Sequence, residues 1–396
     1  MTRKGVWNLQ QVRDKYLQSL WTNDDRLFGW GGNGYGNLGQ NGNLPTNYSS
    51  PIQIDGDWTG ASLFLSNNTS RNAVAAVKSD GTLWAWGQNY RGQLGHNNTT
   101  YYSSPTQIPG TTWNTVSSGG EHTVATKTDG TLWVWGTNAY GTLGQNSIST
   151  PDTTGISSPV QVPGTDWQIT NKYQCVGGEQ ASYGIKTNGT LWSWGLNERG
   201  QLGLNDQVYR SSPVQVGSET TWSKICGNKK IVGAIKTDGT LWTWGLNNWD
   251  GQLGLNDKTD RSSPTQIPGT SWKDIFVGDK NMSATRTDGT LWVWGQNDRG
   301  NLGLNDGSND RRSSPVQLPG TNWNQGVMAE NMSMWSKTDG TLWVAGLNNT
   351  GVLGQNTTIW RSSPIQVGSD TNWDGEISVT QEGMYALKAT LTPSQL

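Results

Sequence analysis

The sequence predicts an all-β fold, a seven-bladed β-propeller whose N- and C-terminal strands pair and close the ring. The first observation is a repeat. The segment TDGTLWVWGTNAYGTLGQN (residues 128–146) recurs in seven versions, from NDDRLFGWGGNGYGNLGQN near the start to TDGTLWVAGLNNTGVLGQN near the end. The position of its second Trp recurs every 49 to 59 residues, from Trp30 to Ala345. A repeat of about 50 residues is typical of one propeller blade or one solenoid unit.

The second observation is a hairpin signal inside each repeat. In the third copy, residues 124–128 (VATKT) run into Asp129-Gly130 and then into residues 131–135 (TLWVW). Asp-Gly between two apolar runs favours a tight β-hairpin, because both residues tolerate the positive φ that the turn requires. Each repeat therefore contributes at least two antiparallel strands.

The third observation concerns the two ends of the repeat array, and it decides between a closed ring and an open stack. Residues 384–388 (MYALK) supply the first half of a hairpin without its second strand, whereas the first copy begins at the turn and supplies only residues 26–31 (RLFGWG). An open array would leave both half-hairpins as unpaired edges. Pairing residues 384–388 with residues 26–31 completes the seventh blade and closes the ring.

Two further elements follow the hairpin in each repeat. A GxLG turn recurs from Gly36-Asn37-Leu38-Gly39 to residues 351–354 (GVLG), and no GKS or GKT follows it as in a phosphate loop. Its glycines predict positive φ or close contact between blades. The triplet SSP also occurs seven times, from residues 49–51 to residues 362–364. Proline suits the start of an outer edge strand, where a missing N–H is tolerated.

Tryptophan is unusually frequent, with 24 residues. The WxW strands hold 12 of them, and a second series occurs once per repeat (Trp58, Trp113, Trp167, Trp222, Trp272, Trp323 and Trp373). Large rings fill the gap of about 10 Å between packed sheets, so these 19 are expected in the core. Trp7, Trp21, Trp249, Trp335 and Trp360 fall outside both series and are available for other contacts.

Composition limits the classes of function. Of 396 residues, 15% are charged, and 28 basic against 30 acidic residues give a net charge of −2. This balance predicts no binding to nucleic acid or anionic lipid. No apolar run approaches the ~20 residues of a membrane span, and MTRKGVWNLQ lacks the apolar stretch of a secretory signal.

Residues 1–22 are expected to form an N-terminal extension, and residues 23–396 the propeller. Apolar residues of the extension follow helical spacing, which predicts a short amphipathic helix that needs a surface to lie on. That surface is either this propeller or another protein. The residues predicted to dock this extension to a partner are Val6, Trp7, Leu9, Val12, Tyr16 and Leu20.

Polar tracts after each GxLG turn are the best candidates for ligand contact. By symmetry they share one region of the ring, and they combine amide, carboxylate and guanidinium groups with aromatic rings. These groups bind sugars or a protein partner; the alternative is a solvated turn of a uniform repeat. The candidate binding residues are Arg210, Arg261, Arg312, Arg361, Asn256, Asp257, Trp249 and Trp360.

Conventional catalysis has little support in the sequence. His96 and His122 occupy different repeat positions, and no HExxH, CxxC, GxSxG or EF-hand pattern occurs. Cys175 and Cys226 are expected as two buried free thiols. We therefore expect no enzyme activity, no cofactor and no metal site.

The DGTLWxWG hairpin, the NxxGQLG turn, the SSPxQV strand and the GGEHT of residues 119–123 resemble the repeat family named for the regulator of chromosome condensation. The resemblance covers roughly residues 23–388. It implies a seven-bladed propeller closed by strand exchange between the termini. It says little about function, because members of this family do unrelated things on one scaffold.

Two activities of that family find little support here. The resemblance would imply nucleotide exchange on a GTPase with a basic N-terminal tail for chromatin, but only Arg3 and Lys4 precede the apolar Val6-Trp7. It would also allow a plant UV-B photoreceptor, but the Gly-Trp-Arg-His-Thr signature of that sensor is absent.

The style of the repeats resembles bacteriophage and bacterial members of the family, and the GVWxL element at residues 5–9 resembles phage tail and fibre proteins. The expected function is a non-enzymatic structural protein of a phage particle, located in the virion as a tail, fibre or surface-exposed part. The expected partners are other virion or scaffold proteins, a host-surface glycan or receptor, and further copies of this chain. The alternatives are a bacterial carbohydrate- or receptor-binding propeller, in the bacterial cytoplasm or at the cell surface, and a regulator of a GTPase.

Overall fold

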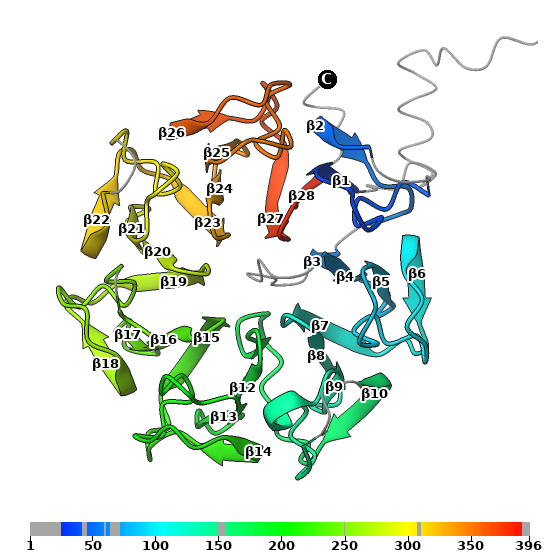
Figure 1. Cartoon of the computed structure of the whole chain (residues 1–396), viewed down its shortest axis with the longest axis vertical. Helices are drawn as coiled ribbons and strands as arrows, with labels where there is room; N and C mark the ends of the chain where they lie inside the picture. Colours follow the sequence, from blue (N-terminus) through cyan, green and yellow to red (C-terminus); the bar gives the residue numbers. More distant parts are fainter. Residues whose placement is uncertain are drawn as a thin grey trace, which may run out of the picture.

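The computed structural model describes residues 25–41, 46–58, 61–63, 72–148, 155–248, 250–306 and 310–389. Seven four-stranded antiparallel sheets surround a central axis as the blades of a propeller (Figure 1). The predicted fold is therefore confirmed. The predicted N-terminal helix with its docking residues, and Trp249, lie outside the described residues.

The strands are numbered along the chain, and each blade takes four of them. Blade 1 holds β3 (Ser62–Leu63), β4 (Ala73–Val77), β5 (Leu83–Gly87) and β6 (Tyr102–Ile108). Blade 2 holds β7 (Trp113–Ser118), β8 (His122–Lys127), β9 (Leu132–Gly136) and β10 (Ile156–Val162), with the short 3-10 helix η1 (Ala139–Gly141). Blade 3 holds β11 (Cys175–Gly177), β12 (Ala181–Ile185), β13 (Leu191–Gly195) and β14 (Arg210–Gln215). Blade 4 holds β15 (Trp222–Asn228), β16 (Ile231–Lys236), β17 (Leu241–Gly245) and β18 (Arg261–Ile267).

The remaining blades follow the same order. Blade 5 holds β19 (Trp272–Val277), β20 (Asn281–Arg286), β21 (Leu291–Gly295) and β22 (Arg312–Leu318). Blade 6 holds β23 (Trp323–Met328), β24 (Met332–Lys337), β25 (Leu342–Gly346) and β26 (Arg361–Gln366). Blade 7 joins β27 (Trp373–Val379) and β28 (Gly383–Lys388) to β1 (Arg26–Gly31) and β2 (Tyr48–Gln53). The first strand of each blade lies nearest the axis and the SSP strand lies outermost, as expected (Figure 1).

Blade 7 closes the ring by pairing the two ends of the chain. β1 and β28 run antiparallel in continuous register from Arg26 opposite Lys388 to Gly31 opposite Gly383. Leu27 and Leu387 in these strands are fully buried. The closure predicted from the two half-hairpins is confirmed.

In blades 1 to 6 the Asp-Gly-Thr turn (Asn-Gly-Thr in blade 3) that leads into the third strand is fixed by short-range hydrogen bonds. In blade 2 the Asp129 carboxylate accepts from the backbone N–H of Thr131 (3.0 Å) and from its hydroxyl (2.6 Å). The Thr131 hydroxyl oxygen in turn accepts from the Trp133 indole (2.8 Å). Gly130 supplies the positive φ of 81°. The DGTLW motif therefore encodes its own hairpin.

Not all 19 tryptophans are core residues, which corrects the sequence-based expectation. The second Trp of each WxW strand and the once-per-repeat series are buried. The first Trp of each WxW strand is only partly buried, because it lies near the hairpin end of the strand. There it forms one side of a cage: Lys127 Nζ lies 4.7 Å from the ring of Trp113 and 4.1 Å from that of Trp133. Trp335, outside both series, is fully buried in β24.

The GxLG turn of one blade fits against the next blade, as its glycines predicted. The Trp135 indole donates to the backbone carbonyl of Gln93 in the preceding turn (2.8 Å). Gly95, in the same turn, has φ of 76°, and a Cβ there would lie 2.9 Å from Nε1 of Trp135. The backbone N–H of Asn97 donates to the carbonyl of Ser157 in the outer strand of the next blade (2.7 Å).

The side chain of Lys172 reaches across the axis of the ring. Lys172 precedes the inner strand of blade 3, yet its Nζ lies 3.2 Å from Gln325 Oε1 of blade 6 and 2.8 Å from Glu376 Oε2 of blade 7. Its side chain is only 8% exposed. The blade 3 repeat has a longer segment between Trp167 and β11 than its neighbours, and this length carries Lys172 across the axis.

Deleting residues 384–396 should destabilise the whole ring, because it removes four fully buried side chains and leaves β1 and β27 with open edges. We expect a loss of at least about 5 kcal/mol in the free energy of unfolding. Thermal and urea unfolding measure it. A shorter deletion of residues 390–396, which leaves β28 intact, is the control. A truncated protein that melts like the intact one would exclude closure as the source of stability.

Gly254→Ala should cost about 2–4 kcal/mol in unfolding free energy. Its φ is +72°, and the new Cβ would lie 2.8 Å from Nε1 of the buried Trp294. Gly217→Ala is the matched control, since Gly217 has φ of +62° but no heavy atom within 4 Å of the Cβ position. It should cost only about 1 kcal/mol. Equal losses for the two variants would show that contact with Trp294 contributes nothing.

Candidate binding surface

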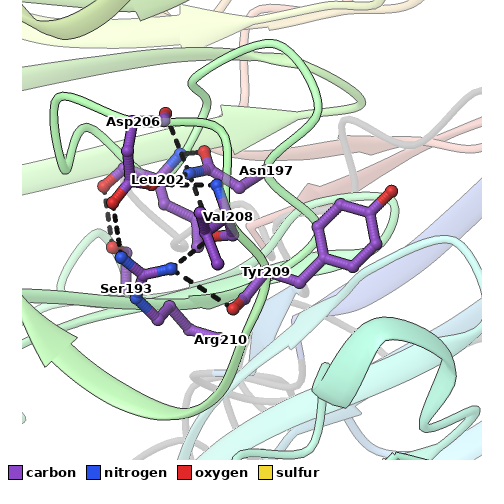
Figure 2. A network of polar contacts seen from close by, with 7 residues as sticks. All are labelled: Ser193, Asn197, Leu202, Asp206, Val208, Tyr209 and Arg210. Atoms are coloured by element: carbon purple, nitrogen blue, oxygen red, sulfur yellow. Dashed lines mark hydrogen bonds and ion pairs between the residues drawn. The ribbon is translucent and has the colours of Figure 1, made fainter.

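The predicted binding arginines belong to a loop that is held by internal polar contacts (Figure 2). Arg210 Nη2 donates to the Asp206 carboxylate (2.5 Å), and Nη1 donates to the Val208 carbonyl (2.7 Å). The Asn197 amide donates to the same carboxylate (2.9 Å). Figure 2 shows the Tyr209 ring pointing away from this network. In blade 3 the arginine charge is thus paired inside its own loop.

The next two blades repeat this pairing. Arg261 lies 2.5 Å from Asp257, and Arg312 lies 2.5 Å from Asp306. Asn256 has φ of 60°, and its N–H donates to the carbonyl of Ser313 in the neighbouring blade (2.7 Å). These predicted binding residues therefore have clear roles in holding the loops, while their binding of a ligand stays a prediction.

Blade 6 departs from the pattern. Thr357 replaces the aspartate, and in the described part of the chain no carboxylate is paired with Arg361. The same loop exposes its apolar side chains, with Ile359 56% and Trp360 42% exposed. The Trp360 indole donates to Asn349 Oδ1 (2.7 Å), and the Arg299 guanidinium of blade 5 lies 4.7 Å from the centre of its ring. Of the predicted residues, Trp360 and Arg361 thus lie on the least internally paired loop.

A cavity of about 280 Å³ adjoins this loop where blade 6 meets blade 7. Asn349, the hydrogen-bond acceptor of Trp360, also lines the cavity. The acidic residues Glu330 and Glu382 and the apolar residues Met332 and Val352 are among those that line it. We call this cavity the junction pocket.

Equivalent junctions show why the junction pocket exists. Glu382 occupies the repeat position of Glu121, which precedes the second strand of blade 2. Glu121 is covered by the turn of blade 1: Arg91 Nε lies 3.5 Å from it, and Tyr90 donates its phenol to it. At the boundary of blades 3 and 4 the charges are reversed, with Lys230 paired to Glu198. At the junction pocket the positions of Tyr90 and Arg91 hold Asn349 and Thr350, so this turn offers no cation to Glu382.

Sequence reasoning missed the junction pocket, because a cavity between two blades leaves no local pattern. The available signal is a comparison of repeat columns: Thr350 stands where Arg91, Arg199 and Arg299 occur in other turns. Tyr35, Tyr140 and Asp250 also replace the arginine in this column, but the residues at the repeat position of Glu121 in the blades that follow are Asn72, Gln180 and Lys280, which are not carboxylates. The signal is therefore the loss of the arginine opposite a glutamate, Glu382.

His122 and the two cysteines, which are residue types suited to catalysis, are buried. His122 is fully buried, its Nε2 lies 2.9 Å from the Ser182 hydroxyl, and burial lowers its pKa to about 4. Cys175 and Cys226 are buried free thiols, as expected, and burial raises the pKa of Cys175 to about 12. Among the residues placed by the structure, no group of three His, Cys, Asp or Glu side chains could hold a metal ion. Nor does that part of the chain contain a helix long and apolar enough to span a membrane.

Comparison with known proteins agrees with this architecture. Human protein RCC2 is 30% identical over 132 residues, which cover 33% of this chain and 24% of that protein. The ultraviolet-B receptor UVR8 of Arabidopsis thaliana is 26% identical over 203 residues, 50% of this chain and 44% of the receptor. The chain thus aligns with less than half the length of either relative.

Solved structures match over nearly the whole ring. Human WBSCR16 superposes with a TM-score of 0.79 at 21% identity, covering 93% of this chain and 100% of that one. Yeast RCC1 (Prp20), solved bound to Kap60, gives a TM-score of 0.77 at 18% identity, covering 94% of this chain and 90% of its own. At these identities the likeness shows the fold alone.

The family model described as the RCC1-like domain matches residues 17–329, which is well over half of the sequence. This match confirms the family expected from the DGTLWxWG, GxLG and SSP elements. The resemblance of the N-terminal GVWxL element to phage tail proteins has no support in these matches and stays a prediction. The chain belongs to the RCC1-like domain family.

Proposed function

We propose that this protein is a non-enzymatic interaction platform that binds an arginine-bearing segment of a protein partner at the junction pocket. One observation carries the proposal. At the equivalent position of blade 2 the carboxylate is covered by an arginine of the same chain, whereas at the junction pocket that arginine is replaced and a cavity remains.

The lining of the junction pocket suits the two parts of an arginine side chain. Met332 and Val352 offer apolar contact for its aliphatic stem. Glu330 and Glu382 offer charge-assisted hydrogen bonds to its guanidinium. Glu330 is paired with Lys280, but at 3.8 Å and between two side chains that are about 40% exposed, and such a pair is weak.

The surroundings of the junction pocket resemble the centre of a protein interface. Trp360 and Ile359 project beside it, and partly exposed aromatic residues next to an anchoring pocket contribute most to many interfaces. A segment with arginine in the pocket and an apolar residue on Trp360 would use both features. The rigid ring supplies a preformed surface, which lowers the entropic cost of binding.

The finer proposal is that the platform is part of a phage particle, with residues 1–22 docking it to a neighbouring virion protein. It rests on the resemblances of the N-terminal element and of the repeat style. The alternatives remain a bacterial carbohydrate- or receptor-binding propeller and a regulator of a GTPase. Prp20p of Saccharomyces cerevisiae has the same fold and binds Gsp1p and histones. This supports the regulator of a GTPase as an alternative.

Methyl NMR can test the junction pocket directly. The chain has six methionines, so methyl-¹³C-methionine gives a simple spectrum in which Met332 reports on the pocket. Titration of the full chain with acetyl-arginine amide should shift the Met332 signal saturably, with affinity in the millimolar range, and the buried Met282 in blade 5 should not move. Glu382→Gln should weaken binding at least about tenfold, because it removes a charged hydrogen-bond acceptor.

Two controls make this test decisive. Glu179→Gln removes a carboxylate from the corresponding hairpin of blade 3 and should leave the titration unchanged. Acetyl-glutamate amide should not shift the Met332 signal. The pocket does not recognise arginine if the Met332 signal does not shift with the arginine probe. The same conclusion follows if the Glu382→Gln and Glu179→Gln variants bind the probe equally.

Virion membership predicts fixed stoichiometry in purified particles. Quantitative mass spectrometry of particles and of the soluble lysate from the source should find the protein in particles at a constant ratio to a capsid protein. A full-length variant with Trp7, Val12 and Leu20 changed to Asp should be lost from particles, because a charged face cannot dock. A protein found only in the soluble fraction would contradict the virion proposal without affecting the junction pocket.

A further inference from the structure

A second recurring cavity lies between the outer strand of one blade and the flank of the next. Between blades 1 and 2 it measures about 490 Å³ and is lined by Gln107 of β6, by Asn97 of the turn, and by the caged Lys127 with Trp113 and Trp133. We call it the β6–β9 cleft. This cleft and the junction pocket are formed by different elements. Binding of a ligand in the cleft is therefore independent of arginine binding at the junction pocket.

Blades 4 and 5 form an equivalent cleft. It measures about 460 Å³ and is lined by Gln266 of β18, Asn256 of the turn, and Arg286 with Trp272 and Trp292. The Arg286 guanidinium lies 4.4 Å from the ring centre of Trp272 and 4.5 Å from that of Trp292. We call it the β18–β21 cleft. Two clefts three blades apart thus present the same set of groups.

The caged cation has a carboxylate partner in several blades. Lys186 lies 3.1 Å from Asp166, the residue just before Trp167. Lys388 lies 2.7 Å from Asp370, and Lys236 pairs with Glu219. The chain itself therefore shows which chemical group this cage accepts.

Blades 2, 5 and 6 lack that carboxylate. Blade 1 has Asp57 at the position of Asp166, just before Trp58. In blades 2, 5 and 6 the same position holds Thr112, Ser271 or Asn322, none of which can neutralise the cation. The β6–β9 cleft belongs to the cage of blade 2, and the β18–β21 cleft to that of blade 5.

In each cleft the caged cation belongs to a lining without carboxylates, and the β18–β21 cleft also holds Arg261. Asp129 and Asp288, two residues after Lys127 and Arg286, interact electrostatically with these cations from the hairpin, outside the lining. None of the residues that line the β6–β9 or β18–β21 cleft is acidic. By contrast, the cleft between blades 3 and 4, of about 410 Å³, contains Glu219. A ligand that brings its own carboxylate would restore the pairing that the other blades make internally.

We propose that the β6–β9 and β18–β21 clefts bind acidic sugars of the uronic acid type. The sugar carboxylate pairs with Lys127 or Arg286, as Asp166 pairs with Lys186. Trp133 and Trp292 are only partly buried, so part of each indole remains for the apolar face of a pyranose ring. The side chains of Gln107 or Gln266 and Asn97 or Asn256 supply donors and acceptors for its hydroxyls. Clefts of 460–490 Å³ lie within the range of small-ligand sites.

Two or more such clefts around one rigid ring favour a polymeric ligand. A chain of acidic sugars that reaches two clefts binds the second without a new loss of translational freedom, which raises the overall affinity. The cage around Lys337 in blade 6 also lacks the carboxylate, because Asn322 stands before Trp323. The ligand class is therefore an acidic polysaccharide rather than an isolated sugar.

The test uses the intact protein and ligand-observed NMR with methyl β-D-glucuronide, and methyl β-D-glucoside as the neutral analogue. The glucuronide should bind and the glucoside should bind at least about tenfold more weakly. The triple variant Lys127→Gln, Arg286→Gln, Lys337→Gln should lose binding at least about tenfold. The matched triple variant Lys186→Gln, Lys236→Gln, Lys388→Gln removes the same number of caged charges, all internally paired, and should bind like the wild type.

A second variant leaves every caged cation in place. Thr112→Asp, Ser271→Asp and Asn322→Asp change exposed residues and supply the missing carboxylates from within the chain. This variant should abolish glucuronide binding while its melting temperature stays the same or rises. Equal binding of glucuronide and glucoside, or retained binding by the aspartate variant, would overturn the proposal. Tighter binding of acetyl-glutamate amide than of the glucuronide would also overturn it and assign the clefts to acidic peptide. Loss of arginine binding at the junction pocket would leave this result unaffected.

Discussion

The contact between the GxLG turn of one blade and the flank of the next is the constraint on which the rest of the ring depends. Gly92 would place a Cβ 2.6 Å from the Cα of Ser157, and Gly351 of blade 6 would place one 2.6 Å from the Cα of Ser49, close to the start of the chain. The N–H of Asn356 donates to the Ser49 carbonyl (2.7 Å). Turn, tryptophan and outer strand are thus coupled from blade to blade, including at the boundary that joins the two ends. Each of these boundaries therefore joins backbone groups of two neighbouring blades.

The sequence was sufficient for the fold because its signals are local and repeated. The Asp-Gly turn, the GxLG turn and the SSP strand each follow from the conformational limits of one or two residue types, and seven copies remove the ambiguity of a single one. Burial was harder to predict. Trp133 and Trp135 alternate with the same apolar neighbours, yet only Trp135 is fully buried, since it reaches the turn of the preceding blade while Trp133 ends beside Lys127. How deeply each residue of a strand is buried depends on how the blades pack in the assembled ring.

The candidate site was less accessible from sequence, for a related reason. Arg210 and Arg361 look equivalent in the sequence, but their difference lies in the residue four positions earlier, Asp206 in one loop and Thr357 in the other. That difference becomes meaningful only once Asp206 is known to receive the arginine. The contact of Lys172 with Glu376 across the axis joins residues 204 positions apart, and no local pattern indicates it. The sequence shows the residue types, but predicting the site also requires knowing which residue each charged side chain pairs with.

A ring of near-identical blades places its distinctive chemistry where a repeated internal pair is broken. A charged group that is partly removed from water and has lost its internal partner gains more from an external partner than a fully solvated charge does. Glu382 has lost the cation that covers Glu121, and Lys127 and Arg286 have lost the carboxylate that accompanies Lys186. The first departure leaves an acidic cavity and the others leave cationic clefts, so a single ring offers separate surfaces of opposite charge. On a scaffold this regular, the exceptions to the repeat are the sites with unsatisfied binding capacity, and the chemistry of the missing partner identifies the ligand.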